Sequence, residues 1–89
     1  MASLQNDNYY LNLYMTQRTY RILLTPEDEG GFSVSVPALP GCFTQGETIE
    51  EAIAMAKEAI TLYVESLEED GEPVPDDSKS LEYSLTFAS

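Results

Sequence analysis

Residues 31–48 read GFSVSVPALPGCFTQGET, and this stretch decides the fold. Phe32, Val34 and Val36 alternate with two serines, which is the pattern of a half-buried strand. Two prolines and Gly41 then interrupt the strand, because proline donates no backbone hydrogen bond and glycine readily turns the chain. Residues 42–45 resume a short extended segment that ends at Gly46. The stretch therefore predicts a strand, a stiff crossover and a second short extended segment.

The residues before this stretch predict a hairpin. Residues 20–25 form a second strand with Ile22 and Leu24 on one face, and Pro26 ends it. An acidic run followed by Gly30 and Gly31 connects the two strands, and glycine adopts the positive φ angles that tight turns require. We expect the two strands to pair antiparallel.

A long amphipathic helix follows. Thr48 is a good N-cap residue, and Glu51 stands three positions later as the second half of a capping box. Apolar residues recur at spacings of three and four up to Leu67, and the helix should stop near Asp70 with Gly71 as its C-cap residue. About 20 residues of helix span about 30 Å, which is enough to cross a small sheet.

Two further strands are predicted near the ends of the chain. Residues 9–15 alternate leucine and methionine with polar residues, and Leu81, Tyr83, Leu85 and Phe87 alternate with polar residues after a loop over 72–80. The predicted fold is α+β, with an antiparallel three- to four-stranded sheet, one long helix on one face and the order β-β-β-α-β. We expect a flexible tail over 1–8 and a single domain over 9–89.

Charge narrows the choice of partners. The 89 residues carry 16 acids and four bases, for a formal net charge of −12. Four scattered bases do not form the cationic cluster that nucleic-acid binding needs, so we expect no direct nucleic-acid binding. The acidic field favours a basic protein partner. The alternative is that the acidity only keeps the protein in solution. The bases are Arg18, Arg21, Lys57 and Lys79.

Several sequence features bear on cellular location. The one cysteine, Cys42, has no partner for an internal disulfide, which fits a reducing compartment. No apolar run approaches the roughly 20 residues of a membrane span, and residues 1–8 lack the basic start and apolar core of a secretion signal. We therefore expect a cytoplasmic protein without a membrane partner.

The residue inventory argues against catalysis. The sequence has no histidine, so a Ser-His or Cys-His nucleophile pair cannot form, and Cys42 lacks a neighbouring base to activate it. A magnesium-dependent nuclease was the remaining enzymatic possibility, but no carboxylate occupies an inward position of a predicted strand. We expect no catalytic residue, no metal site and no cofactor.

Residues 31–48, together with the acidic and alanine-rich helix after them, closely resemble the HicB antitoxin family. The resemblance extends from about Tyr20 to Pro75, and its most specific part is the run V-P-x-L-P-G-C-x-T-x-G over 36–46. It implies a truncated RNase H-like fold and a partner of the HicA type, a small basic toxin that cleaves mRNA. Many HicB proteins add a C-terminal DNA-binding domain, and the end of the sequence at Ser89 leads us to expect none here. The same glycines and prolines could also serve the conformation alone.

The predicted binding residues follow from charge and from this resemblance. For the toxin they are the turn acids, the residues around the proline-rich loop and two helix acids: Glu27, Asp28, Glu29, Phe32, Pro37, Leu39, Pro40, Glu65 and Glu69. The alternative function is a regulatory or structural homo-oligomer, a dimer or tetramer, that has no toxin partner. With or without a toxin we expect a homo-dimer or tetramer, and its expected interface residues are Tyr9, Leu11, Leu13 and Tyr83.

Overall fold

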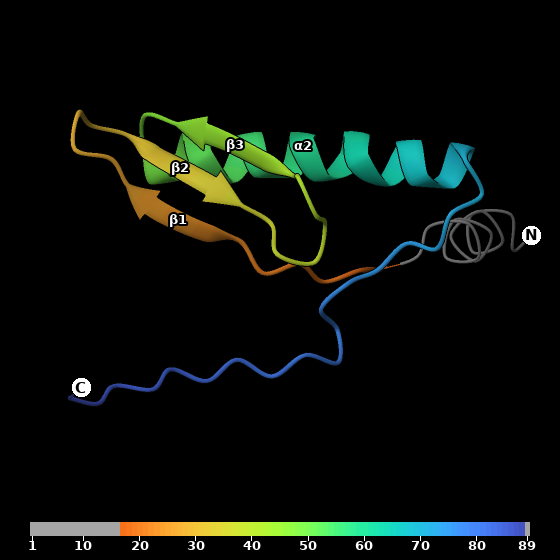
Figure 1. Cartoon of the computed structure of the whole chain (residues 1–89). Helices are drawn as coiled ribbons and strands as arrows, with labels where there is room; N and C mark the ends of the chain where they lie inside the picture. Colours follow the sequence, from red (N-terminus) through yellow and green to blue (C-terminus); the bar gives the residue numbers. More distant parts are fainter. Residues whose placement is uncertain (1–16, 89) are drawn as a thin grey trace, which may run out of the picture.

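The computed structural model describes residues 17–88. Within them, strands β1 (Leu23–Pro26), β2 (Phe32–Ser35) and β3 (Phe43–Gly46) precede helix α2 (Ile49–Glu69). The sheet has the order β1-β2-β3, with both neighbouring pairs antiparallel. Figure 1 shows the helix lying along one side of the sheet. The predicted α+β class, with an antiparallel sheet and one long helix, is confirmed.

The predicted hairpin forms, with a later start than expected. The N–H of Glu27 donates to the carbonyl of Gly31 at 3.0 Å, and both turn glycines have positive φ, 100° for Gly30 and 77° for Gly31. β1 begins at Leu23 rather than residue 20, because the register pairs Leu23 with Ser35, where β2 ends. The residues before Leu23 consequently have no strand residue of β2 opposite them.

The proline-rich loop between β2 and β3 folds inward. Its ends close on each other, since the N–H of Val36 donates to the carbonyl of Cys42 at 3.1 Å and the N–H of Leu39 donates back to Val36 at 2.9 Å. Leu39 is fully buried with Val36 and Cys42 in a cluster that the second half of the helix covers. The hydroxyl of Tyr63 donates to the carbonyl of Pro40 at 2.7 Å. The loop is thus part of the core.

Both ends of α2 carry specific caps. The Thr48 hydroxyl accepts the N–H of Glu51 at 3.0 Å, as predicted. The Glu51 carboxylate accepts the N–H of Glu47 at 2.6 Å, one residue earlier than the reciprocal bond of a capping box. At the other end Gly71 has a φ of 69°, and the N–H groups of Gly71 and Glu72 donate to the carbonyls of Glu68 and Leu67. This pair of bonds is a Schellman motif.

The helix approaches the sheet through small residues. Val34 packs against Ala52 and Ala56, all three buried. Gly46, at the end of β3, lies beneath the first turns of the helix, where a Cβ atom would be 2.4 Å from the nitrogen of Ala52. Because side chains alternate along a strand, Ser35 and its cross-strand partners Leu23 and Phe43 occupy the opposite face. That face has no helix over it among residues 17–88.

The segment after the helix returns to the start of β1. The N–H of Asp77 donates to the carbonyl of Thr19 at 2.7 Å, and the Asp77 carboxylate accepts the N–H of Arg21 at 2.8 Å. The Asp76 carboxylate accepts the N–H of Thr19 at 3.1 Å. Asp76 and Asp77 therefore hold the segment after the helix against the residues that precede β1.

The prediction of a last strand from Leu81 to Phe87 is wrong. Residues 81–88 are exposed, and they pair with none of the strands described within residues 17–88. The alternation of apolar and polar residues is typical of a strand. A strand forms, however, only where a neighbouring strand supplies backbone hydrogen bonds. The tail predicted over 1–8 and the strand predicted over 9–15 lie outside the described residues.

Replacing Gly46 with alanine should destabilise the fold far more than the same change at Gly30. At Gly46 the new Cβ collides with helix backbone, which has no flexible end to move, so we expect a cost of about 3 kcal/mol. At Gly30 nothing lies within 4 Å, and only the positive φ opposes alanine, at about 1–2 kcal/mol. Urea unfolding of the two variants measures the difference; equal losses would contradict the close approach.

Acid should weaken the anchor at Asp76. The N–H of Thr19 and the hydroxyl of Ser78 hold the pKa of Asp76 below its ordinary value. The unfolded chain therefore takes up this proton first, so the stabilisation is complete above the unfolded pKa and is lost as pH falls below about 4. We expect the stability difference between wild type and Asp76→Asn, measured by urea unfolding, to shrink from pH 6 to pH 3. A difference that stays constant over this range would contradict the role of the charge.

Candidate protein-binding surface

Six carboxylates gather where the β1–β2 turn meets the start of the helix. The turn and the residue after β3 line one hollow, in which Glu27 and Glu47 both take part. Glu51 is tied to Glu47 through its hydrogen bond to the Glu47 N–H, and the Ser33 hydroxyl donates to Glu27 at 2.8 Å. We call this surface the acidic end; it consists of Glu27, Asp28, Glu29, Glu47, Glu50 and Glu51.

No base neutralises the acidic end within residues 17–88. Arg18 pairs with Glu68 in the last turns of the helix, and Arg21 pairs with Asp77 beside the start of β1, each at 3.5 Å. Neither of these ion pairs involves a residue of the acidic end. Uncompensated charge of one sign produces a field that attracts oppositely charged partners over a distance of about one Debye length.

The other predicted toxin contacts lie at the opposite end of the sheet. Pro37 and Pro40 are exposed in the β2–β3 loop, and Glu65 and Glu69 are exposed on the second half of the helix. Figure 1 shows this loop and the end of α2 away from the β1–β2 turn. The predicted contact residues thus form two groups rather than one continuous site.

Two of the predicted contacts have internal roles. Leu39 has no exposed surface and supports the proline-rich loop from within. Phe32 is half-buried and packs against the cluster of Val34 and the helix alanines. Among the predicted oligomer contacts, Tyr83 is exposed, and Tyr9, Leu11 and Leu13 lie outside the described residues.

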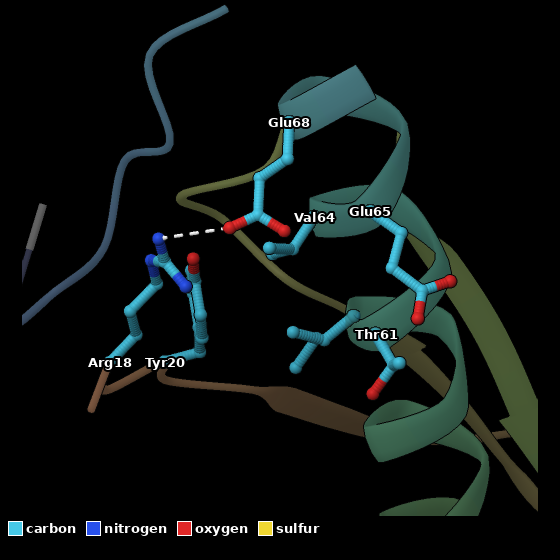
Figure 2. A pocket seen from close by; sticks show the side chains of 7 residues that line it. Arg18, Tyr20, Thr61, Val64, Glu65 and Glu68 are labelled. Atoms are coloured by element: carbon cyan, nitrogen blue, oxygen red, sulfur yellow. Dashed lines mark hydrogen bonds and ion pairs between the residues drawn. The ribbon is translucent and has the colours of Figure 1, made fainter. Parts of the chain in front are cut away.

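A groove between the helix and the segment before β1 was not predicted from the sequence. It encloses about 340 Å³ and combines an apolar floor with a charged rim (Figure 2). Its lining residues are Arg18, Tyr20, Ile60, Thr61, Val64, Glu65 and Glu68. The sequence signal was the helical spacing of Ile60 and Val64, which indicates a helix face but not what lies opposite it.

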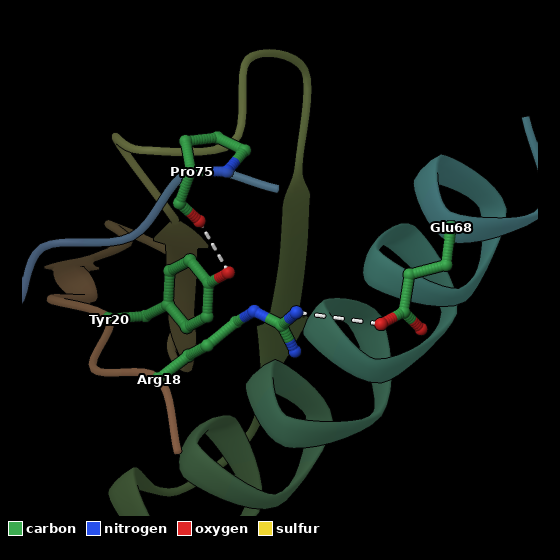
Figure 3. A network of polar contacts seen from close by, with 4 residues as sticks. All are labelled: Arg18, Tyr20, Glu68 and Pro75. Carbon is green, nitrogen blue, oxygen red and sulfur yellow. Dashed lines mark hydrogen bonds and ion pairs between the residues drawn. The ribbon is translucent and has the colours of Figure 1, made fainter. Parts of the chain in front are cut away.

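Polar contacts close one end of this groove. Figure 3 shows Tyr20, whose hydroxyl donates to the carbonyl of Pro75, beside the Arg18–Glu68 ion pair. Burial raises the pKa of Tyr20, with Asp76 and Asp77 adding to the shift and Arg18 opposing it. The tyrosine therefore stays a neutral hydrogen-bond donor, and it links the start of the described chain to the segment after the helix.

Two features of the described residues bear on possible chemistry: the state of the one cysteine and the placement of metal-ligating side chains. Cys42 is a free, buried thiol, and burial raises its pKa, so it is a poorer nucleophile than an exposed cysteine. Across residues 17–88 no three side chains of the His, Cys, Asp and Glu types are placed so that they could hold one metal ion. In the same residues, no helix has the length and apolar character needed to cross a membrane.

Comparison with protein families gives one clear match. Residues 20–87 match the family described as the HicB-like antitoxin of bacterial toxin–antitoxin systems. The match includes both strands of the hairpin, the proline-rich loop, the helix and the exposed C-terminal residues. It therefore covers most of the chain.

Individual relatives agree with the family match. A UPF0150 protein of Thermoplasma acidophilum is 49% identical over 59 residues, which cover 66% of this chain and 86% of the relative. A UPF0150 protein of Synechocystis is 50% identical over 56 residues, covering 63% of this chain and 71% of the relative. Antitoxin HicB of Escherichia coli K12 is 43% identical over 56 residues, which cover 63% of this chain and 41% of that antitoxin.

The thiol of Cys42 should react slowly in the native protein. Its burial and raised pKa both reduce the exposed thiolate that an alkylating reagent attacks. At pH 7.5 we expect iodoacetamide to modify the native protein at least about tenfold more slowly than the protein in urea, because the buried sulfur must first be exposed by opening of the structure. Mass spectrometry over time measures both rates. Equal rates would show an accessible thiol and reopen a role for it in chemistry.

Proposed function

The chain belongs to the HicB-like antitoxin family of bacterial toxin–antitoxin systems, and from this membership we propose that it binds and neutralises a small basic toxin of the HicA type. The observation that carries the proposal is the acidic end, six carboxylates with no base paired to them in residues 17–88. The proposed role is binding, without catalysis, cofactor or direct contact with nucleic acid, and we place it in the cytoplasm.

The acidic end suits a partner that itself binds RNA. A toxin that cleaves mRNA needs lysine and arginine side chains to hold phosphate groups. Carboxylates on a rigid turn and on the first helical turn compete for the same side chains through charge-assisted hydrogen bonds. Binding there would cover the cationic surface of the toxin and keep RNA away from it.

The geometry of the acidic end supports a preformed surface. Hydrogen bonds of the Glu27–Gly31 turn and the Thr48 cap hold the backbone that carries these acids. A rigid surface loses little conformational entropy on binding. We propose Glu27, Asp28 and Glu29 as the first contacts, with Phe32 fixing the turn from behind through its packing in the core.

The second group of predicted contacts extends this proposal. Pro37 and Pro40 present exposed, rigid apolar surface, and Glu65 and Glu69 add charge on the helix at the same end of the molecule. Long-range charge steers encounter, whereas apolar contact slows dissociation. A toxin large enough to reach both ends would use the first group for association and the second for retention.

A second candidate function is a homo-oligomer that acts without a toxin. The observation that favours it is the run of large apolar side chains left exposed over residues 81–87. A chain that associates with itself but captures no basic protein would have this function.

Reversing the charge of Glu27, Asp28 and Glu29 together to lysine should slow association with the toxin. The change turns the charge of these three positions from −3 to +3 on the surface that we propose as the first contact. Steering of this kind changes association rates by about 10- to 1,000-fold. We expect a loss of at least about tenfold in the association rate constant at low salt, measured by surface plasmon resonance with the small basic protein encoded beside this chain. Rescue of growth from that toxin should fall in parallel.

The matched control reverses three acids elsewhere: Glu58, Glu72 and Glu82, which are all exposed and lie outside the acidic end. It makes the same change in net charge, so an effect of total charge alone would slow both variants equally. Equal slowing, or growth rescue that survives the Glu27, Asp28 and Glu29 reversal, would remove the acidic end from the mechanism. Circular dichroism establishes that both variants fold.

A further inference from the structure

The C-terminal arm, residues 81–88, is an exposed apolar strand sequence that pairs with no other strand in the part of the chain that the structure describes. Leu81, Tyr83, Leu85 and Phe87 are each between 76 and 97% exposed, and none belongs to either core cluster. In an extended chain these four side chains lie on one face, because side chains alternate. Contiguous apolar surface of this kind marks a site of protein interaction.

The outer edge of β1 is open to receive such a strand. β1 is an edge strand, and no described strand lies on its outer side. The backbone groups of Thr19 and Arg21 bond outward, to Asp76 and Asp77. Within β1 the direction reverses, because Leu23 and Thr25 pair with Ser35 and Ser33, whose backbone groups face β1. The outward groups of β1 are therefore those of Leu24 and the carbonyl of Pro26. The outer edge of β1 therefore offers a short row of backbone groups beyond the Asp77 anchor, with an N–H at Leu24 and none at Pro26.

The helix leaves an apolar surface beside this edge. α2 packs mainly against β3 and β2. Ile49 and Ile53 are 51 and 42% exposed, and their spacing to Ile60 places all three on one flank of the helix. Ile60 lines the groove that faces Tyr20, so this flank looks toward the β1 side. Ile22 and Leu24, half-buried, continue the same apolar surface on the strand.

The chain that leads into the arm lies beside the start of β1, but it then turns away from the sheet. The bond from the Asp77 N–H to the Thr19 carbonyl sets the chain beside β1, where it could continue as a parallel strand. The N–H of Ser80 then donates to the Asp77 carbonyl at 3.0 Å and closes a turn. After this turn the arm leaves its own sheet, and Figure 1 shows it ending apart from the body of the molecule.

We propose that the arm of one copy pairs with the open β1 edge of a second copy, reciprocally, as a fourth strand of its sheet. The apolar face of the arm would cover Ile49 and Ile53 of the partner copy's helix. Each chain carries both a donor strand and an acceptor edge that it does not join, and a two-fold exchange satisfies both in each copy. Residues 78–88 carry one base, Lys79, and one acid, Glu82, so the arm and the turn before it together add no net charge to the acidic body on which they dock.

This dimer does not depend on the proposed toxin binding, and sedimentation equilibrium of the full chain tests it. We expect a dimer at about 20 μM, and the variant Leu85→Asp with Phe87→Asp should sediment as a monomer, with the mass halved. Both side chains lie outside the core, so this variant should fold as wild type does, which circular dichroism checks. The charge reversal at Glu27, Asp28 and Glu29 should leave the dimer intact.

The matched control is Ser84→Asp with Thr86→Asp. It adds the same two charges to the same arm, but on the face that would point to solvent in the paired strand. We expect it to remain a dimer. A monomeric wild-type chain, with the arm folded on its own sheet or free, would overturn the proposal. So would a dimer that survives the Leu85 and Phe87 changes, or one that the control abolishes.

Discussion

Helix α2 and strand β3 meet at a point where no side chain fits between them. A Cβ atom at Gly46 would lie 2.4 Å from the backbone nitrogen of Ala52, so the helix starts in direct contact with the end of the strand. This contact fixes where Thr48 caps the helix and how the alanines at 52 and 56 reach Val34. The acidic end follows from the same contact, because it brings Glu47, Glu50 and Glu51 beside the β1–β2 turn.

Because the helix and the sheet meet through small residues, little apolar surface is buried between them. The fully buried apolar residues of the described chain are two valines, one leucine, one cysteine and two alanines. A domain of this size buries only about 60% of the surface that its unfolded chain exposes, so such a core gives modest stability. The inward loop with Leu39 and the two aspartate anchors add contacts that the sheet and helix alone do not supply. Pairing with a second chain would add more.

The features that depend on residues close together in the sequence could be predicted, and those that depend on distant residues could not. The hairpin turn and the helix caps depend on residues within five positions of each other, so glycine, threonine and the apolar periodicity were enough to place them. Whether residues 81–87 pair with a strand depends on what lies beside them, which alternation does not reveal. The groove beside Tyr20 likewise joins residues 40 or more positions apart. For the candidate contacts, charge identified the acids of the β1–β2 turn, but it did not show that helix acids complete the acidic end or that Leu39 is buried.

The two proposed associations differ in the force that opposes or drives them. A basic toxin is drawn to the acidic end by unlike charge, and salt screens that attraction. Two copies of this chain carry a formal charge of −12 each and repel, so salt screens a repulsion instead. The apolar face of the arm must overcome this repulsion, which explains why an almost neutral segment is suited to bridge two acidic bodies. Salt should therefore weaken the binding of the toxin and strengthen the pairing of the chains, because charge acts with opposite sign in the two.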